Sequence, residues 1–265
     1  MLTSFMIYAV VGAIAGVLAG LLGIGGGLVI VPMLVFSFTL QHIPQELMMH
    51  LALGTSLASI IFTSVSSFRA HHKRGAVRWD VFKRITPGIL VGTFAGSCVA
   101  SRLPTHILKG IFVAFLYYVA TQMILGKKPA ATRQVPGTAG IFGAGGVIGS
   151  FSSLVGIGGG TLSVPFLTWC NIPVHHAIGT SSAIGLPIAL AGAFGYMLNG
   201  LGTPNLPDLS LGYVYLPALI GIICFSVLTA PLGAKLAHSL PVDKLKRIFA
   251  ILLYVVATRM LISVF

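Results

Sequence analysis

Long apolar runs separated by short polar stretches dominate the chain. Runs of about 20 apolar residues are long enough to cross a bilayer as helices. The pattern predicts six such helices, at Met48–Phe68, Val81–Ala100, Ile107–Leu125, His175–Leu198, Leu211–Ala237 and Lys246–Phe265. Two further apolar segments, from Phe5 to about Thr39 and from about Thr138 to Cys170, contain runs of glycine and are predicted to be broken helices.

The two broken segments share a nearly identical motif. Gly20–Pro32 has the sequence Gly-Leu-Leu-Gly-Ile-Gly-Gly-Gly-Leu-Val-Ile-Val-Pro, and Ser153–Pro165 has the sequence Ser-Leu-Val-Gly-Ile-Gly-Gly-Gly-Thr-Leu-Ser-Val-Pro. Glycine costs roughly 1 kcal/mol relative to alanine inside a helix, so three in succession interrupt it. Freed backbone groups at membrane depth are tolerated only where protein buries them or where they line a wet cavity. Two matching interruptions, one in each half of a chain, therefore indicate the binding site of a transporter.

The internal repeat extends beyond the glycines. His50–Ser56 matches His175–Ser181, including a shared Gly-Thr-Ser, and Leu116–Met123 matches Leu253–Met260. These matches indicate a tandem duplication. The predicted division is a first transmembrane repeat at 1–126, a cytoplasmic linker at 127–137 and a second transmembrane repeat at 138–265.

Basic residues bear on how the two repeats are oriented. The loop Arg69–Arg84 holds six Lys and Arg residues, whereas its counterpart Asn199–Ser210 holds none. If each broken segment re-enters on its own side, thirteen of the 16 Lys and Arg residues are cytoplasmic and both termini lie outside. If each segment crosses once, the split is about ten against six, so the positive-inside rule favours re-entry. The sequence thus predicts an all-α integral membrane fold of two inverted repeats, each a glycine-broken re-entrant helical hairpin plus three spanning helices.

Composition agrees with a membrane protein and narrows its partners. The chain is 56% hydrophobic and 8% charged, with a mean hydropathy of +0.99, whereas soluble domains carry about a quarter charged residues. The basic residues that give the net charge of +12 lie in short loops between spans, as in membrane proteins. We therefore expect a multi-pass protein in a lipid bilayer and no nucleic-acid partner. The sequence leaves open whether the chain forms a homo-oligomer.

The few acidic residues bear on the substrate. Glu46, Asp80, Asp208 and Asp243 are the complete set, and each lies at the end of a predicted span. Carriers of cations and protons often place a carboxylate inside a span, so we expect a small anionic substrate. No spacing of metal ligands and no pairing of a nucleophile with an acid stands out, so no metal, no cofactor and no enzyme activity are expected.

The glycine breaks are the first candidate binding elements. A helix that begins after a break presents unpaired N–H groups and the positive end of its dipole. This arrangement suits an anion; the alternative is that the glycines only allow close helix packing. The candidate backbone ligands are Gly25, Gly26, Gly27, Gly158, Gly159 and Gly160.

Seven side chains complete the candidate site. The duplicated Gly-Thr-Ser offers hydroxyl donors, although such groups in membrane helices often bond only their own helix. The equivalent His50 and His175 are either capping residues or proton carriers, and Arg259 either snorkels to the interface or binds an anion. The candidate substrate-binding side chains are Thr55, Ser56, Thr180, Ser181, His50, His175 and Arg259.

The paired Gly-x-Gly-Gly-Gly followed by Val-Pro, the downstream Gly-Thr-Ser pair and the basic loop resemble the TauE/SafE family of sulfite exporters, membrane permeases for sulfur compounds. The resemblance covers the chain from about Tyr8 to the last helix. It implies a secondary carrier of the bacterial inner membrane for sulfite, a sulfonate or a related sulfur-containing organic anion, working by alternating access. A passive anion channel is the alternative that the sequence leaves open. No motif separates uptake from export.

Overall fold

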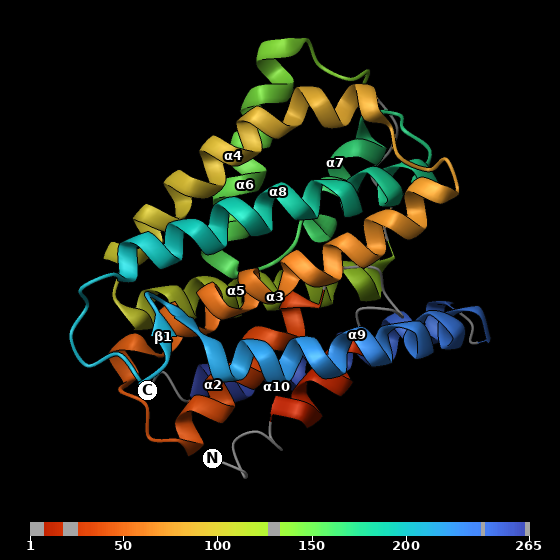
Figure 1. Cartoon of the computed structure of the whole chain (residues 1–265). Helices are drawn as coiled ribbons and strands as arrows, with labels where there is room; N and C mark the ends of the chain where they lie inside the picture. The colour runs from red at the N-terminus through yellow and green to blue at the C-terminus, as the bar shows by residue number, and fades with distance from the viewer. Residues whose placement is uncertain (1–7, 18–25, 127–132, 240–241, 263–265) are drawn as a thin grey trace.

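The computed structural model of the chain is almost entirely helical (Figure 1). It describes residues 8–17, 26–126, 133–239 and 242–262. The elements in the described ranges are the helix Tyr8–Val17, α2 Gly27–Leu40, α3 Gln45–Lys73, α4 Trp79–Arg102, α5 Thr105–Leu125, α6 Thr138–Val155, α7 Gly160–Trp169, α8 Val174–Gly200, β1 Ser210–Leu211, β2 Val214–Tyr215, α9 Leu216–Ser239 and α10 Val242–Ile262.

Several helices have the length and composition of membrane spans. Within the described ranges, α3, α5, α6 and α8 are long and apolar enough to cross a bilayer. The helix Tyr8–Val17, α2 and the first part of α9 are shorter apolar helices. The all-α membrane class predicted from the hydrophobic pattern is confirmed, and the chain is a multi-pass membrane protein.

One helix boundary predicted from the sequence is wrong. The helix expected at Leu211–Ala237 begins only at Leu216, because β1 and β2 form a small antiparallel hairpin that pairs Ser210 with Tyr215. Gly212 makes the turn with φ +55°. A Cβ on Gly212 would lie 2.1 Å from the Met197 carbonyl oxygen of α8, so the turn needs glycine for close approach as well as for backbone geometry.

The two longest helices lie at the centre and run in opposite directions. Along α3, Gly54 faces Tyr196 and Leu57 faces Gly192, while Ser64 faces Gly185. Residue numbers rise on α3 as they fall on α8, so the helices are antiparallel. These two helices carry the matching Gly-Thr-Ser motifs, so this pair of equivalent helices has opposite directions.

The helices α5 and α10 form a second pair of equivalents, joined by reciprocal contacts. The Tyr117 hydroxyl lies 2.8 Å from the Thr258 hydroxyl, and the Tyr254 hydroxyl lies 2.6 Å from the Thr121 hydroxyl. Tyr117 matches Tyr254 and Thr121 matches Thr258 in the internal repeat. The tyrosine of each half therefore bonds the threonine of the other half, and α5 and α10 are antiparallel.

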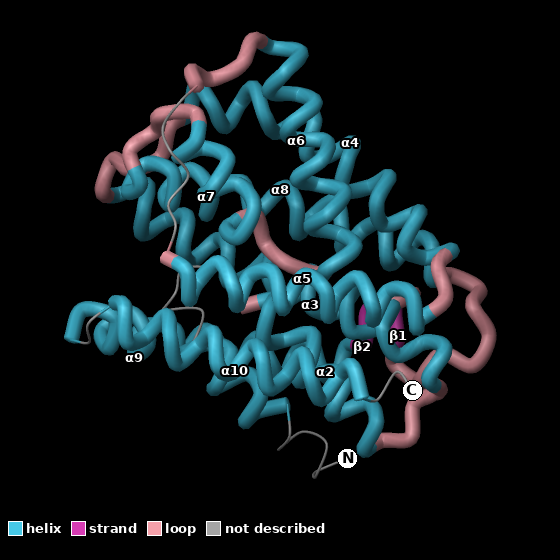
Figure 2. Tube along the Cα trace, turned by 180° about the vertical axis from the view of Figure 1, so that it is seen from behind, coloured by secondary structure: helices cyan, strands magenta, loops and turns pink. Residues whose placement is uncertain are grey.

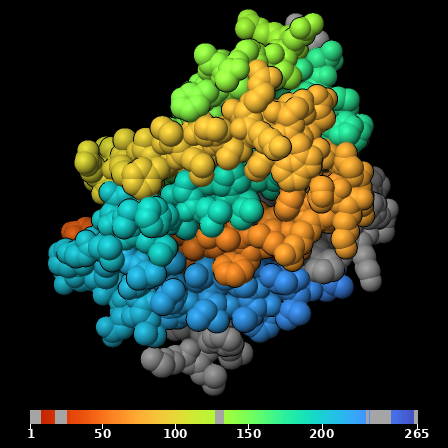
Figure 3. Space-filling model, turned by 45° about the horizontal axis from the view of Figure 1, so that its top comes forward, coloured from red at the N-terminus to blue at the C-terminus, as the bar shows by residue number. Residues whose placement is uncertain are grey.

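Helices of the two halves interleave rather than forming two separate blocks. α4 packs against α6 through glycines: a Cβ at Gly88 would lie 2.0 Å from the Phe142 carbonyl oxygen, and one at Gly92 would lie 2.1 Å from that of Gly146. Figure 3 shows bands of first-half helices in orange and yellow alternating with second-half helices in green, teal and blue. α4 therefore belongs, by packing, with α6 and α8.

The two ends of each broken segment lie close together. Tyr8, at the start of the first segment, accepts a hydrogen bond of 2.6 Å from the Gln41 side chain just after α2. In the second segment the Arg133 N–H donates to the Trp169 carbonyl oxygen at 3.3 Å, and its guanidinium lies 4.8 Å from the Trp169 ring centroid. In each segment, a residue near its start therefore contacts a residue near its end.

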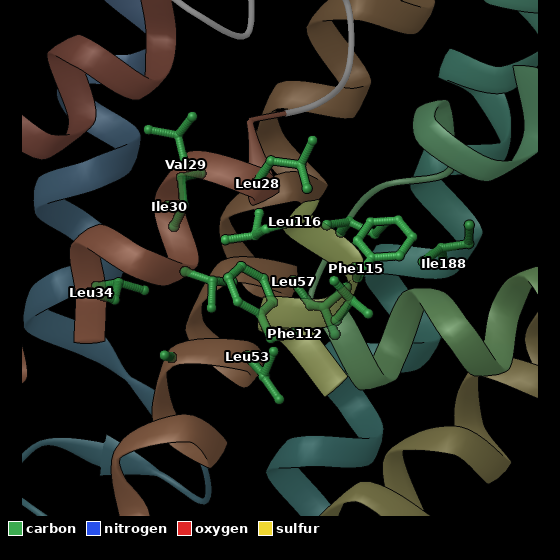
Figure 4. Close-up of a cluster of buried hydrophobic side chains, with 14 of the residues drawn as sticks. Leu28, Val29, Ile30, Leu34, Leu53, Leu57, Phe112, Phe115, Leu116 and Ile188 are labelled. Carbon is green, nitrogen blue, oxygen red and sulfur yellow. The ribbon is translucent and has the colours of Figure 1, made fainter. Parts of the chain in front are cut away.

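An apolar cluster joins the start of α2 to α3, α5 and α8. Figure 4 shows Leu28 of α2, Leu57 of α3, Phe112 of α5 and Ile188 of α8 gathered in one group. All four are at most 2% exposed. Lipid tails are as apolar as these side chains, so in a membrane the cluster stabilises the fold through van der Waals packing between α2, α3, α5 and α8.

Candidate substrate site

The two glycine breaks meet inside the protein. A Cβ on Gly27, the first residue of α2, would lie 2.6 Å from the Gly156 carbonyl oxygen and 2.9 Å from the Ile157 Cα. Figure 2 shows the loop between α6 and α7 as a pink segment in the interior. Backbone from one break therefore touches backbone from the other, as only glycine permits.

Ile60 of α3 lies between the two breaks. Its Cδ1 would lie 3.2 Å from a Cβ on Gly27, and its Cγ2 would lie 3.4 Å from a Cβ on Gly158. Ile60 is fully buried. An apolar side chain therefore lies between Gly27 and Gly158, next to the point where the two breaks touch.

The start of α7 carries an unpaired polar group. Within the described part of the chain, the Thr161 hydroxyl is buried and has no hydrogen-bond partner. Thr161 lies in the first turn of α7, where backbone N–H groups also lack partners within the helix. A buried hydroxyl left without a partner costs about 1–3 kcal/mol. The Thr93, Ser152 and Ser210 hydroxyls are also buried without a partner among the described residues, and Thr161 differs from them in lying at the start of α7.

The serines of the two Gly-Thr-Ser motifs contact the breaks. Ser56 donates a hydrogen bond of 2.8 Å to the Gly156 carbonyl oxygen. The Ser181 hydroxyl lies 2.8 Å from that of Ser163, which in turn donates to the Gly159 carbonyl oxygen. All three serines are buried. Ser56 thus contacts the second break directly, and Ser181 reaches the same break through Ser163.

The threonines of the same motifs have different partners. The Thr55 hydroxyl accepts a hydrogen bond of 3.0 Å from the Tyr215 N–H, and the Thr180 hydroxyl accepts one of 2.9 Å from the Arg78 N–H. Both threonines are fully buried. Each therefore holds a loop that belongs to the other half of the chain.

The two equivalent histidines lie in unlike surroundings. Nε2 of His50 lies 3.2 Å from the Ala100 carbonyl oxygen and 3.1 Å from that of Leu103, where α4 ends. His175 is exposed and lies beside His176, with 4.2 Å between the ring centroids. His50 thus has the contacts of a helix cap, and neither histidine reaches the breaks through a contact found here.

The remaining candidates are placed as follows. Arg259 is exposed in the last turn of α10 and is not brought to the glycine breaks by any contact in the described ranges. Gly26 has φ +77°, which glycine adopts readily, and Gly160 begins α7. Gly25 lies outside the described residues.

Charge gathers on the face where α3 ends and α4 begins. The Arg78 guanidinium binds the Asp80 carboxylate through two hydrogen bonds of 2.9 and 2.7 Å. These bonds hold the pKa of Asp80 below its usual range. Both side chains are largely exposed, so the pair contributes at most about 1 kcal/mol.

Sequence reasoning missed Ile60 and Thr161. Thr161 stands where the first copy of the motif has Leu28, so the difference between the two copies was the available signal. Ile60 had no signal, because only the folded chain brings it between Gly27 and Gly158. The described residues contain no group of three or more His, Cys, Asp or Glu side chains arranged to hold a metal ion.

Long apolar helices, two glycine-broken segments and their buried meeting point define the class of protein as a membrane transporter. The family follows from comparison of the sequence. The family model described as "Sulfite exporter TauE/SafE" matches residues 8–260, and the chain belongs to this family.

Curated relatives agree with this assignment. A protein of Haemophilus influenzae named "Probable membrane transporter protein" is 42% identical, over 99% of this chain and 100% of its own length. The probable membrane transporter protein YdhB of Bacillus subtilis is 29% identical over 91% of this chain and 94% of its own. A probable membrane transporter protein of Methanocaldococcus jannaschii is 29% identical over 96% and 94%. No solved structure matches the chain.

Proposed function

We propose that this protein is a secondary transporter that moves a small anion, such as sulfite, a sulfonate or a related sulfur-containing organic anion, across the cell inner membrane by alternating access. The observation that carries the proposal is the unpaired Thr161 hydroxyl in the first turn of α7, the helix that follows the second glycine break. A helix N-terminus favours negative charge. The name of the family supports sulfite as the first anion to test.

The anion would be held mainly by backbone groups. Of the candidate backbone ligands, Gly26 and Gly27 stand at the start of α2 and Gly158, Gly159 and Gly160 at the start of α7, where Thr161 adds a hydroxyl donor. Ser56 bonds the Gly156 carbonyl oxygen directly and Ser181 reaches the Gly159 carbonyl oxygen through Ser163, so both would position the backbone of the second break. Ile60 fills the space between the two breaks in this conformation, so its side chain would move aside when the anion binds.

Opposite helix directions support inverted repeats. α3 and α8 carry the same motif and are antiparallel, and α5 and α10 share reciprocal contacts. In each broken segment a residue near its start contacts a residue near its end, as in a re-entrant hairpin. This geometry supports two inverted repeats, which is the architecture that many secondary carriers use for alternating access.

The positive-inside rule gives the orientation. The side chain of Arg84 donates a hydrogen bond of 3.0 Å to the Pro136 carbonyl oxygen, so the basic α3–α4 loop lies on the same face as the linker. We assign this face to the cytoplasm, because both segments are rich in Lys and Arg.

Flux through purified protein tests the proposed function. Proteoliposomes that contain the full chain should exchange labelled sulfite at a saturable rate, and sulfonates and carboxylates should compete with it. Thr161→Val should raise the half-saturating concentration by roughly tenfold or more, because a hydrogen bond to a charged ligand contributes about 1.5–3 kcal/mol. Thr161→Ser keeps the hydroxyl and is the matched control.

Two outcomes would contradict the proposal. Absence of flux for every anion in the panel, from protein that is folded and inserted, would refute an anion carrier of this class. Unitary currents in planar bilayers would instead indicate a passive anion channel.

A further inference from the structure

Two loops dock on the central helices by the same pattern, one at each end of the molecule. At one end the Ala76 carbonyl oxygen would lie 2.6 Å from a Cβ on Gly179, and the Arg78 N–H two residues later donates to Thr180. At the other end the Tyr213 carbonyl oxygen would lie 2.3 Å from a Cβ on Gly54. The Tyr215 N–H, again two residues later, donates to Thr55.

Each Gly-Thr pair therefore forms a complete docking point. Glycine leaves room for the loop carbonyl, because any larger residue would clash with backbone atoms. The next residue supplies the oxygen that accepts the N–H of the loop. The first two parts of Gly-Thr-Ser thus hold a loop of the other half, whereas the serine contacts the breaks.

The docked loops are buried, unlike ordinary surface connections. Ala76 and Val77 are each 8% exposed, and Tyr213 and Val214 are 7% and 2% exposed. Histidines reinforce both contacts: His176 Nδ1 lies 3.2 Å from the Ala76 carbonyl oxygen, and the His50 ring lies 5.0 Å from that of Tyr213. Loops normally run over the surface, so their burial here indicates a specific role.

The docking points flank the place where the breaks meet. Thr55 precedes Ile60 on α3, and Thr180 precedes Gly185 on α8, in each case by about 7 Å at 1.5 Å per residue. Ile60 contacts both breaks, and a Cβ on Gly185 would lie 3.8 Å from the Gly159 nitrogen. Because α3 and α8 are antiparallel, one threonine lies on each side of this meeting point.

We infer that Ala76–Arg78 and Tyr213–Tyr215 are the two gates of the transport cycle, and that Thr180 and Thr55 are positioning residues that latch them shut. The inference rests on the proposed function and reassigns these two threonines from substrate ligands to latches. Both latches are closed in this conformation. Release of one at a time opens the central site to one face, as alternating access requires.

Accessibility of a central cysteine tests the two latches separately. Ser64 is 5% exposed and lies next to Gly185, so Ser64→Cys reports on the centre in a chain whose three cysteines are replaced by alanine. Vesicles of both orientations are treated with a membrane-impermeant maleimide. Thr180→Val should raise the labelling rate roughly fivefold from the face of the α3–α4 loop alone, because one net hydrogen bond is lost.

The second latch should respond from the other face. Thr55→Val should raise labelling by a similar factor from the face of the β1–β2 hairpin alone. Thr180→Ser and Thr55→Ser keep the accepting oxygen and should label at the parent rate. If a valine variant does not fold, the corresponding alanine variant removes the same oxygen with less bulk.

The assignment of the two gates would be overturned if folded Thr180→Val and Thr55→Val label at the parent rate. It would also be overturned if labelling of both variants rises from the same face. The readout needs no transported anion. If each valine variant is labelled from one face only but the protein shows no anion flux, the gates are supported and the proposed anion substrate is rejected.

Discussion

Gly27 lies where two chain segments come within backbone contact. An added Cβ would lie 2.6 Å from the Gly156 carbonyl oxygen and 2.9 Å from the Ile157 Cα, and neither backbone atom can turn away as a flexible side chain can. We expect Gly27→Ala to separate the breaks and to abolish most anion flux while the protein still inserts. Flux and thermal unfolding, measured on the same proteoliposome preparations, check this.

Gly143→Ala is the control for that substitution. Gly143 is a helical glycine of α6 with nothing within 4 Å of an added Cβ, so its flux should equal that of the parent. Equal flux in Gly27→Ala and Gly143→Ala would mean that contact between the breaks has no part in transport.

The sequence was informative about single residues only where the signal was local. Successive glycines predicted the breaks, because glycine interrupts a helix wherever it is placed. The partners of Thr55 and Thr180 could not be predicted, since the Tyr215 and Arg78 N–H groups are more than a hundred residues away along the chain. Such contacts depend on how the two halves interleave, which no local pattern records.

At the scale of helices, the close packing of α4 on α6 is marked in the sequence by regularly spaced glycines. Gly88, Gly92 and Gly96 recur every four residues on α4, and they face the backbone of Phe142, Gly146 and Ser150 on α6. The Ser150 hydroxyl also donates 2.9 Å to the Gly92 carbonyl oxygen. Recurrence of this kind is typical of close helix packing in membranes. It was visible in the sequence, yet only the folded chain identifies α6 as the partner.

Two glycines in this contact should respond oppositely to alanine. A Cβ on Gly92 would lie 2.1 Å from the Gly146 carbonyl oxygen, so Gly92→Ala should destabilise the protein by about 1–3 kcal/mol through overpacking. A Cβ on Gly146 would come no closer than 3.8 Å to a neighbour. Gly146→Ala should therefore be neutral or stabilising, by up to about 1 kcal/mol of helix propensity.

Thermal unfolding in detergent measures both variants. A lower midpoint for Gly92→Ala, with no loss for Gly146→Ala, is the expected result. Equal midpoints for the two would show that the α4–α6 contact is looser in the membrane than its geometry requires.

At the scale of the whole molecule, packing defines groups that cross the two sequence halves. α4 packs tightly on α6 and lies beside α8, and the Thr229 hydroxyl of α9 donates 2.9 Å to the Ala13 carbonyl oxygen of the helix Tyr8–Val17. Figure 1 shows α4, α6, α7 and α8 together in the upper part of the molecule. Packing therefore groups α4 with these second-half helices.

Topology gives the last prediction, because inverted and parallel repeats differ in one measurable way. Lys73 ends α3 and Leu201 follows α8, so the two residues lie at the ends of equivalent helices, and both are exposed. Because α3 and α8 are antiparallel, single cysteines at these positions should react with an impermeant maleimide from opposite faces, Lys73→Cys from the cytoplasmic side. Labelling of both from one face would require parallel repeats, and a site formed by two mirrored breaks would then lose its geometric basis.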